Sequence, residues 1–274
     1  MRLTVTFGGR PANGIDMQHS TRTVIVTGAS RGIGRATAVR LAEDFDLVVL
    51  VARSRDGLTE CADEIEGAGG RALVHPADLR LPGAAAEVIA ATIGATGRID
   101  AIANVAGAVP QANLMTLTDE EWDDGLAMKF HGARRLALAG WDCLKASQGA
   151  IVFVSGATAA MPSAALAAVS TVNAAISAMA KAFADQGLAD NVRVNAVLPG
   201  AIMTSRRMAM IERYAAARNL ATDDAVAHYT AQAGIARFGR PEEIAELIAF
   251  ALSPVTQWMT GTTLRMDGGE TRAL

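Results

Sequence analysis

The sequence predicts an α/β protein with one doubly wound parallel sheet of about seven strands and helices on both faces. Three observations support this class. Short apolar runs rich in leucine and β-branched residues recur along the chain, helical stretches separate them, and no repeat or linker divides the 274 residues. A chain of this length fits a single domain. We therefore assign residues 21–274 to one domain, preceded by a loosely ordered extension at residues 1–20, with Met17 as an alternative start.

The predicted strands are the continuous apolar runs, as expected where helices cover both faces of a parallel sheet. They span Thr23–Thr27, Leu47–Ala52, Ala72–Pro76, Ala101–Asn104, 151–155, 193–198 and Thr263–Met266. The carboxyl ends of such strands meet at one edge of the sheet, where ligands bind in folds of this type.

Helices are predicted in the intervals between these strands. The first covers residues 33–45. A capping box formed by Thr118 and Glu121, in which each side chain bonds a free backbone amide, opens a helix over residues 122–138.

The remaining helices lie in the second half of the chain. An alanine-rich helix covers residues 164–187 and ends at Gly187, and Pro241 opens the last helix. Residues 205–234 have a helical composition and form an insert between two strands. We expect this insert to lie above the ligand-binding edge of the sheet.

Composition excludes several functional classes. The hydrophobic share is 51%, but 57 residues are alanine, and the longest strongly apolar run, Leu47–Ala52, is far shorter than a membrane span. Residues 1–20 lack the apolar segment of a secretory signal. The net charge of −3, without basic clusters, argues against nucleic-acid binding, and two distant cysteines argue against a disulfide framework or a metal site. We expect a cytoplasmic protein.

A glycine-rich turn gives the strongest functional signal. Residues 27–34 read T-G-A-S-R-G-I-G, directly after the first strand and at the start of the first helix. Glycines at Gly28, Gly32 and Gly34 allow a tight turn and let a pyrophosphate approach the free amides of the helix. The turn therefore predicts a dinucleotide site in a Rossmann-like fold.

The end of the second strand predicts which dinucleotide binds. An acid at this place accepts hydrogen bonds from the ribose of NAD, whereas the extra phosphate of NADP requires cations. This strand ends in Arg53 and Ser54 without an acid, and Arg31 in the glycine turn adds a second guanidinium. The sequence favours NADP(H) over NAD(H).

The glycine turn and the motifs that follow resemble the short-chain dehydrogenase/reductase family over nearly the whole chain, from about Thr23 to Gly269. The matching segments are N-V-A-G at 104–107, A-D-L at 77–79, P-G-A-I-M-T at 199–204 with Asn195, and D-G-G at 267–269. The resemblance implies that Asp78 contacts adenine, Ile202 and Thr204 contact nicotinamide, and Asn104 and Gly107 shape the floor of the site. The full set of expected cofactor-binding residues is Gly28, Ser30, Arg31, Gly32, Ile33, Gly34, Arg53, Ser54, Asp78, Leu79, Asn104, Ala106, Gly107, Pro199, Gly200, Ile202 and Thr204.

The family usually handles the substrate oxygen with a tyrosine, a lysine, a serine and an asparagine. Ungapped counting from Asn195 and Pro199 places these four on Val169, Asn173, Gly156 and Lys129. All four residue types therefore differ from the family pattern. Among substitutes, Ser155 is a weak candidate, because its side chain should point to the opposite face of the strand from Gly156.

Lys129 is the stronger candidate, because burial readily lowers a lysine pKa. It is suited to act as an acid, an anion anchor or a Schiff-base amine, or it is a purely structural lysine.

Three functions remain open at this point. The first is an NADP(H)-dependent oxidoreductase of this family acting on a small carbonyl or alcohol, with altered proton-transfer residues. The second is a catalytically inactive NADP(H)-binding protein that serves as a regulatory or structural subunit. The third is a non-redox lyase or isomerase that uses Lys129. The resemblance also implies a homotetramer or homodimer, and we expect no metal, nucleic acid or membrane as a partner.

Overall fold

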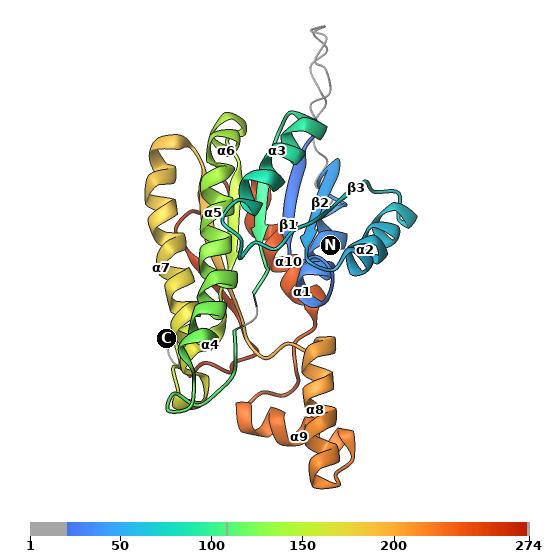
Figure 1. Ribbon diagram of the computed structural model, residues 1–274, viewed down its shortest axis with the longest axis vertical. Coiled ribbons are helices and arrows are strands. Elements are labelled where there is room, and N and C mark those ends of the chain that lie inside the picture. Colours follow the sequence, from blue (N-terminus) through green and yellow to red (C-terminus); the bar gives the residue numbers. More distant parts are fainter. Residues whose placement is uncertain (1–20, 108, 273–274) are drawn as a thin grey trace, which may run out of the picture.

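A computed structural model describes residues 21–107 and 109–272 of the chain (Figure 1). Its sheet contains seven parallel strands in the order β3-β2-β1-β4-β5-β6-β7. The strands are β1 (Thr23–Thr27), β2 (Leu47–Ala52), β3 (Ala72–Pro76), β4 (Ala101–Asn104), β5 (Ala150–Val154), β6 (Arg193–Pro199) and β7 (Thr263–Met266). The predicted fold class is confirmed, and each predicted strand is present to within one residue at either end.

Helices cover both faces of this sheet, as the continuous apolar strands require. Alternate residues of one strand serve the two layers: Ile25 packs in one core, and Val24 and Val26 in the other. One layer holds α3 (Ala84–Thr96), α5 (Gly132–Ala139), α6 (Trp141–Ser147) and α7 (Ala167–Asp190), and the other holds α1 (Gly32–Leu41), α2 (Arg55–Gly67) and α10 (Pro241–Leu252).

The helix predicted over residues 122–138 is interrupted. It begins as α4 (Asp119–Gly125) with the predicted capping box, continues as a π-helical turn over Leu126–His131, and resumes as α5. A π-turn inserts an extra residue into the helical ladder and is frequent at functional sites. Sequence periodicity alone does not reveal it.

The predicted end of the long helix at Gly187 is wrong. Helix α7 continues to Asp190 and ends at Asn191, which adopts the left-handed conformation with φ of 58°. Gly187 serves packing instead, because a Cβ at this position would lie 2.1 Å from the carbonyl oxygen of Val192. The segment Ala164–Asp190 is also long and apolar enough to cross a membrane by length and composition. Here it packs on the sheet and contributes Ile176 to the core.

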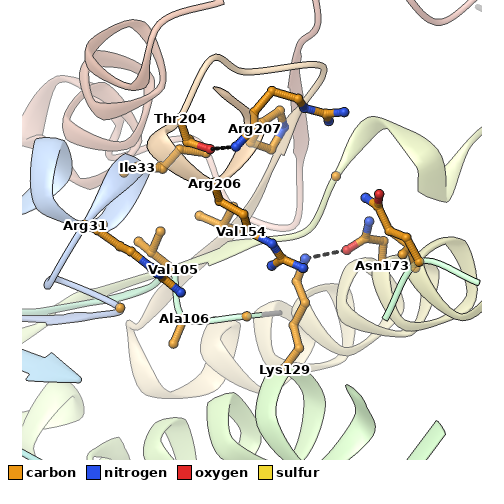
Figure 2. A pocket seen from close by; sticks show the side chains of 18 of the residues that line it. Arg31, Ile33, Val105, Ala106, Lys129, Val154, Asn173, Thr204, Arg206 and Arg207 are labelled. Atoms are coloured by element: carbon orange, nitrogen blue, oxygen red, sulfur yellow. Dashed lines mark hydrogen bonds between the residues drawn. The ribbon is translucent and has the colours of Figure 1, made fainter. Parts of the chain in front are cut away.

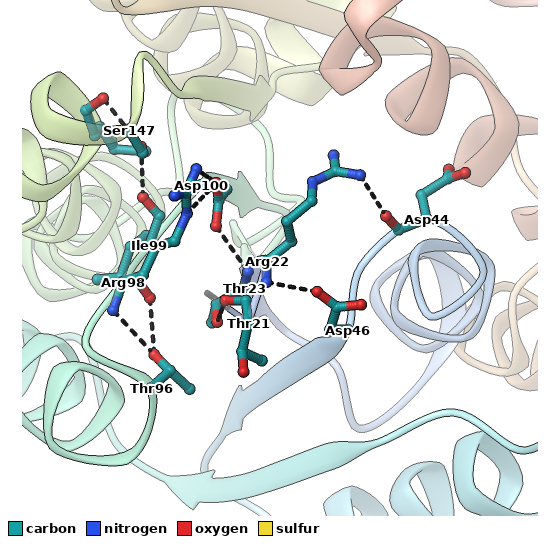
Figure 3. Close-up of polar contacts among 11 residues, drawn as sticks. Thr21, Arg22, Thr23, Asp44, Asp46, Thr96, Arg98, Ile99, Asp100 and Ser147 are labelled. Carbon is teal, nitrogen blue, oxygen red and sulfur yellow. Dashed lines mark hydrogen bonds and ion pairs between the residues drawn. The ribbon is translucent and has the colours of Figure 1, made fainter. Parts of the chain in front are cut away.

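Carboxylates close the amino-terminal edge of the sheet (Figure 3). The amide of Thr23 at the start of β1 donates to Asp100, 2.9 Å away, and the amide of Arg22 donates to Asp46 at 2.7 Å. Arg98 in turn forms an ion pair with Asp100. Polar groups at this edge are thus partnered within the protein, while the opposite edge carries the cavity described below.

The insert predicted over residues 205–234 forms two helices, α8 (Ser205–Arg218) and α9 (Thr222–Ala233). They pack on each other around Ile211, Ala225 and Phe238, in a small core separate from those of the sheet. Figure 1 shows the pair projecting beyond the sheet layers. The extension predicted at residues 1–20 lies outside the described residues.

Arg193 fixes the end of α10 against β6. Its guanidinium donates to the carbonyl oxygens of Ala251, Leu252, Ser253 and Thr256 at 3.0–3.3 Å. Thr256 Oγ1 also donates to Ala251 and Ser253, and the Met259 amide donates to Thr256, so among the described residues only the Leu252 carbonyl depends on Arg193 alone.

We expect Arg193→Leu to lower the free energy of unfolding by about 1–3 kcal/mol, because it removes the guanidinium bonds to four carbonyls and leaves the Leu252 carbonyl without a donor. Urea denaturation of the variant and of Arg213→Leu, which removes an exposed arginine, measures the difference. Equal stability of the two variants would show that this cap contributes little.

Candidate active site

A cavity of about 1240 Å³ opens at the carboxyl ends of the strands. Its walls come from the glycine turn, the ends of β2, β4, β5 and β6, the start of α7, and the insert. Figure 2 shows side chains from these elements pointing into the same space. The cavity lies at the edge of the sheet where the sequence predicts a ligand.

The glycine turn is held against the end of β4. Thr27 Oγ1 accepts hydrogen bonds from the amides of Val105 and Ala106, at 3.0 and 2.9 Å. Gly28 has φ of +71°, and a Cβ at Gly34 would lie 2.1 Å from the Gly28 oxygen. These positions require glycine, and the turn presents the first amides of α1 to the cavity as a cradle suited to an anion.

Cations without partners stand beside this cradle. Arg31 and Arg53 line the cavity, and within the described ranges neither forms an ion pair. Ser54 Oγ accepts from the amide of Gly57 and so caps α2. No acid from the end of β2 lines the cavity. The residues present therefore fit a dinucleotide with an additional phosphate on its ribose.

Most of the predicted cofactor-binding residues line the cavity; the exceptions are Asp78, Asn104 and Ile202. The Asp78 carboxylate pairs with Arg80 at 2.6 Å, and the Arg80 guanidinium lowers the pKa of Asp78. Asn104 is buried, and neither atom of its side-chain amide has a hydrogen-bond partner. Thr204 lines the cavity, and its hydroxyl also accepts from the amide of Arg207 at the start of α8.

Lys129 lies on the floor of the cavity, within the π-turn between α4 and α5. Its Nζ donates to the Ser155 carbonyl oxygen at 2.8 Å and to Asn173 Oδ1 at 2.5 Å (Figure 2). Its hydrocarbon stem passes over Gly107, where a Cβ would lie 2.7 Å from Lys129 Cδ. Burial of the ammonium lowers the pKa of Lys129 to about 8.

Asn173 connects Lys129 to the loop after β5. Its Nδ2 donates to Thr158 Oγ1 at 2.7 Å, while its Oδ1 accepts from Lys129. A Cβ at Gly156 would lie 2.5 Å from Asn173 Nδ2, so this amide orientation requires the glycine. Thr158 was not predicted as a site residue, and only its place shortly after a strand end could have indicated it.

Ser155 is engaged with α7. Its hydroxyl is buried, donates to the carbonyl oxygen of Asn173 at 2.7 Å and accepts from Ser177 Oγ at 3.0 Å. The contribution of Ser155 to the floor is therefore its backbone carbonyl, which holds Lys129. Sequence reasoning also missed Gln111 and Glu270 as cavity residues. Glu270 lies near the end of the chain, and no motif there indicates it.

Known proteins resemble this chain over most of its length. A sequence model of the family described as Enoyl-(Acyl carrier protein) reductase matches residues 28–271. The short-chain reductase protein NovJ of Streptomyces niveus is 32% identical over 246 residues, which cover 89% of this chain and 92% of NovJ. The chain belongs to the short-chain dehydrogenase/reductase family.

Solved members of the short-chain dehydrogenase/reductase family share its fold. L-Sorbose reductase from Gluconobacter frateurii, complexed with NADPH and L-sorbose, superposes with a TM-score of 0.89 at 28% identity, over 95% of this chain and all of the other. Actinorhodin polyketide ketoreductase with NADPH gives a TM-score of 0.86 at 27% identity, over 92% of this chain and 98% of the other.

The four positions that the short-chain dehydrogenase/reductase resemblance assigns to catalysis all line one cavity. They hold Lys129, Gly156, Val169 and Asn173. Within residues 21–107 and 109–272, no group of three histidine, cysteine or acidic side chains is arranged to hold a metal ion. The chemistry of the floor therefore rests on Lys129, Asn173 and Thr158.

The titration of Lys129 is open to direct measurement, because the chain has only three lysines, Lys129, Lys145 and Lys181. Labelling lysine Cε with ¹³C and recording NMR spectra against pH should give a midpoint near 8 for Lys129. Lys145 should titrate above its ordinary value, because Asp190 lies 2.7 Å away and raises its pKa.

Lysine-to-arginine substitutions at each position assign the three resonances. A titration midpoint for Lys129 at or above that of Lys145 would contradict the claim that burial lowers the pKa of Lys129.

Proposed function

We propose that the protein is an NADP(H)-dependent oxidoreductase that acts on a small carbonyl or alcohol substrate, with Lys129 as its proton-transfer group. The observation that carries this proposal is the contact between Lys129 Nζ and Asn173 Oδ1 on the cavity floor. By resemblance, Lys129 stands at the asparagine position of the family and Asn173 at its lysine position. Relative to the family pattern, the lysine and the asparagine have thus exchanged positions, and their side chains are hydrogen-bonded to each other.

The cofactor assignment rests on charge. Arg31 and Arg53 line the cavity beside the glycine cradle, and no acid at the end of β2 competes for the ribose. A dianionic phosphate pairs well with two guanidinium groups, and NADH lacks this additional phosphate. The NADPH complexes of L-sorbose reductase and actinorhodin ketoreductase support the same assignment.

The geometry of Lys129 suits it to act on a substrate oxygen. An ammonium has three donor protons, and two of them are directed at Ser155 and Asn173. The third is available to an oxygen in the cavity. With a pKa of about 8, Lys129 is mostly protonated at pH 7 and is a stronger acid than an ordinary lysine.

When bound, NADPH would supply the hydride for reduction of a carbonyl carbon. Lys129 donates a proton to the carbonyl oxygen, which becomes the hydroxyl of the alcohol product. The neutral amine then regains a proton from water that enters the open cavity. Asn173 and the Ser155 carbonyl hold the ammonium in place, and Thr158 fixes the orientation of the Asn173 amide. Val169 offers no group for proton transfer.

A second candidate is a non-catalytic NADP(H)-binding subunit. The observation in its favour is the continuous chain of hydrogen bonds from Thr158 through Asn173 to Lys129 and Ser155. These polar groups on the cavity floor have partners within the protein and need no substrate to provide them. A third candidate, a lyase or isomerase that uses Lys129, shares the cavity but needs no net hydride transfer.

We also propose a cytoplasmic homodimer or homotetramer. Several large apolar side chains of the described chain are exposed, and four of them bear on this proposal. Val255 and Trp258 lie between α10 and β7, and Leu138 and Leu188 lie on α5 and α7. Contiguous exposed apolar surface commonly marks an interface, and α5 and α7 belong to the helices that the family resemblance implicates in assembly.

The first test measures cofactor preference. Fluorescence titration should show that NADPH binds at least tenfold more tightly than NADH, because only NADPH carries the additional ribose phosphate for which Arg31 and Arg53 are suited. Arg53→Asp should weaken NADPH binding at least tenfold, while Arg55→Asp, at an exposed position outside the cavity, should leave it unchanged. No binding of NADPH to the wild type at micromolar concentration would remove both cofactor-dependent functions.

The second test measures turnover. NADPH consumption is screened over carbonyl, enone and imine compounds, and Lys129→Met should lower kcat/KM by about 10²-fold or more. Because Lys129 must be protonated to act, the rate of reduction should fall as pH rises through about 8. Lys181→Met is the matched control, since Lys181 lies outside the cavity. Turnover that survives Lys129→Met would overturn the assigned role.

A restored variant separates the alternatives. It combines Lys129→Asn, Gly156→Ser, Val169→Tyr and Asn173→Lys. If only this variant consumes NADPH, the wild type is the non-catalytic subunit. If the wild type converts a compound from the screen without consuming NADPH, it is the lyase or isomerase.

A further inference from the structure

Two arginines occupy an electrostatically unfavourable place at the start of α8. Thr204 caps this helix, and Ser205, Arg206 and Arg207 form its first residues, with no acid in the first turn. The amino-terminal end of a helix carries partial positive charge, so cations there are repelled and lower stability. Both arginines line the cavity. An unfavourable charge kept at a cavity wall indicates a ligand of opposite sign.

Neither arginine is neutralised within the described part of the chain. Arg206 and Arg207 form no ion pair and donate no side-chain hydrogen bond there; the amide of Arg207 donates to Thr204 Oγ1. Arg207 is half-buried, its guanidinium lies 5.9 Å from the centre of the Phe238 ring, and burial lowers its pKa. Two guanidinium groups thus line the cavity without an ion-pair partner among the described residues.

The nearby acid Glu270 compensates them only in part: its charge favours the protonated form of Arg207 and so raises the pKa of Arg207, but within the described chain it forms no ion pair with either arginine. Its Oε2 accepts from the amide of Ala201 at 2.8 Å, and burial raises the pKa of the Glu270 carboxyl. Glu270 is the only acidic residue among the described residues that line the cavity. Against it stand five cations, which are Arg31, Arg53, Lys129, Arg206 and Arg207. The cavity is therefore strongly positive in a chain whose net charge is −3.

The five cations divide between two ends of the cavity. Arg31 and Arg53 stand beside the glycine cradle, where the proposed cofactor places its phosphates. Arg206 and Arg207 come from the insert, and Figure 2 shows the Arg206 side chain extending into the cavity toward the side where Lys129 lies. Arg206 therefore reaches the space between the insert and Lys129, and Arg207 lines the wall of the same cavity beside Phe238.

We propose that the substrate is a small oxo acid whose carboxylate is bound by Arg206 and Arg207 while its carbonyl oxygen meets Lys129. This inference rests on the proposed oxidoreductase function. Guanidinium groups bind carboxylates through paired, charge-assisted hydrogen bonds, and such an anchor orients the carbonyl at a fixed distance from it. The same pair of arginines is chemically able to bind the pyrophosphate of the cofactor. The experiment below therefore distinguishes a substrate carboxylate from the cofactor pyrophosphate as their ligand.

The experiment compares acids with their uncharged esters on the protein saturated with NADP⁺. The probes are 2-oxobutanoate, 3-oxobutanoate and 4-oxopentanoate with their methyl esters, and binding is followed by thermal shift and isothermal calorimetry. At least one acid should bind the wild type at least tenfold more tightly than its ester. Arg206→Gln and Arg207→Gln should each weaken that binding at least tenfold, while Arg213→Gln, an exposed position on the same helix outside the cavity, should not.

Two further measurements complete the test. Without ligand, Arg206→Gln and Arg207→Gln should unfold at the same or a higher temperature than the wild type, because each removes a cation from the positive end of α8. Their affinity for NADPH should stay within about threefold of the wild type. A tenfold loss of NADPH affinity would assign both arginines to the cofactor pyrophosphate and overturn the inference.

Equal binding of acids and esters, or no binding of any acid to the wild type, would overturn it as well. Failure of NADPH to bind the wild type counts separately, against the proposed function. In that case the acids and esters are compared on the protein without cofactor.

Discussion

The enclosed ammonium of Lys129 is the constraint on which the rest of the site depends. A buried cation is costly unless oxygen atoms surround it, and Lys129 finds two, in the Ser155 carbonyl and the Asn173 side chain. Each of these partners imposes a further requirement. Asn173 can direct its oxygen to Lys129 only because its Nδ2 has Thr158 as an acceptor and because Gly156 carries no side chain to obstruct it.

The backbone adapts to the same requirement. The stem of Lys129 passes over Gly107, a position where any Cβ would come within 2.8 Å of two of its carbon atoms. The residue itself sits in the π-turn of Leu126–His131, which re-aims the side chains of that helix relative to a regular α-helix. The residues at three of the positions that the resemblance assigns to catalysis, Lys129, Gly156 and Asn173, are therefore mutually dependent, because each contact around Lys129 requires the residue that stands there.

The sequence predicts the fold far better than the site, for physical reasons. Strands such as Leu47–Ala52 are buried on both faces, so each appears as a continuous apolar run with clear ends. The glycine turn is equally local, since its conformation follows from residues within one stretch. Helix ends are predicted less well. A glycine commonly ends a helix, but Gly187 lies within α7, where the close approach of the Val192 carbonyl leaves no room for a side chain. This contact depends on tertiary packing and cannot be predicted locally.

The pairing of Lys129 with Asn173 lies beyond local reasoning, because 44 residues separate them and their contact depends on how α7 crosses the π-turn. Counting from motifs identifies both positions but not that they touch. Thr158 and Glu270 are harder still, since neither belongs to a pattern that sequence alone associates with a ligand.

The charge of the cavity differs from the net charge of the whole chain. The chain carries a net charge of −3, yet the described residues that line the cavity include five cations and one acid. Long-range attraction to an anion is screened by salt over about 10 Å, so what a small anionic ligand experiences is the local field of the cavity and not the charge of the whole chain. Burial lowers the pKa of Lys129, and an anion bound beside the ammonium would favour its protonated form, so anion binding and protonation of Lys129 would be coupled. A negatively charged substrate would then raise the protonated fraction of the group that has to deliver the proton, and an uncharged one would not.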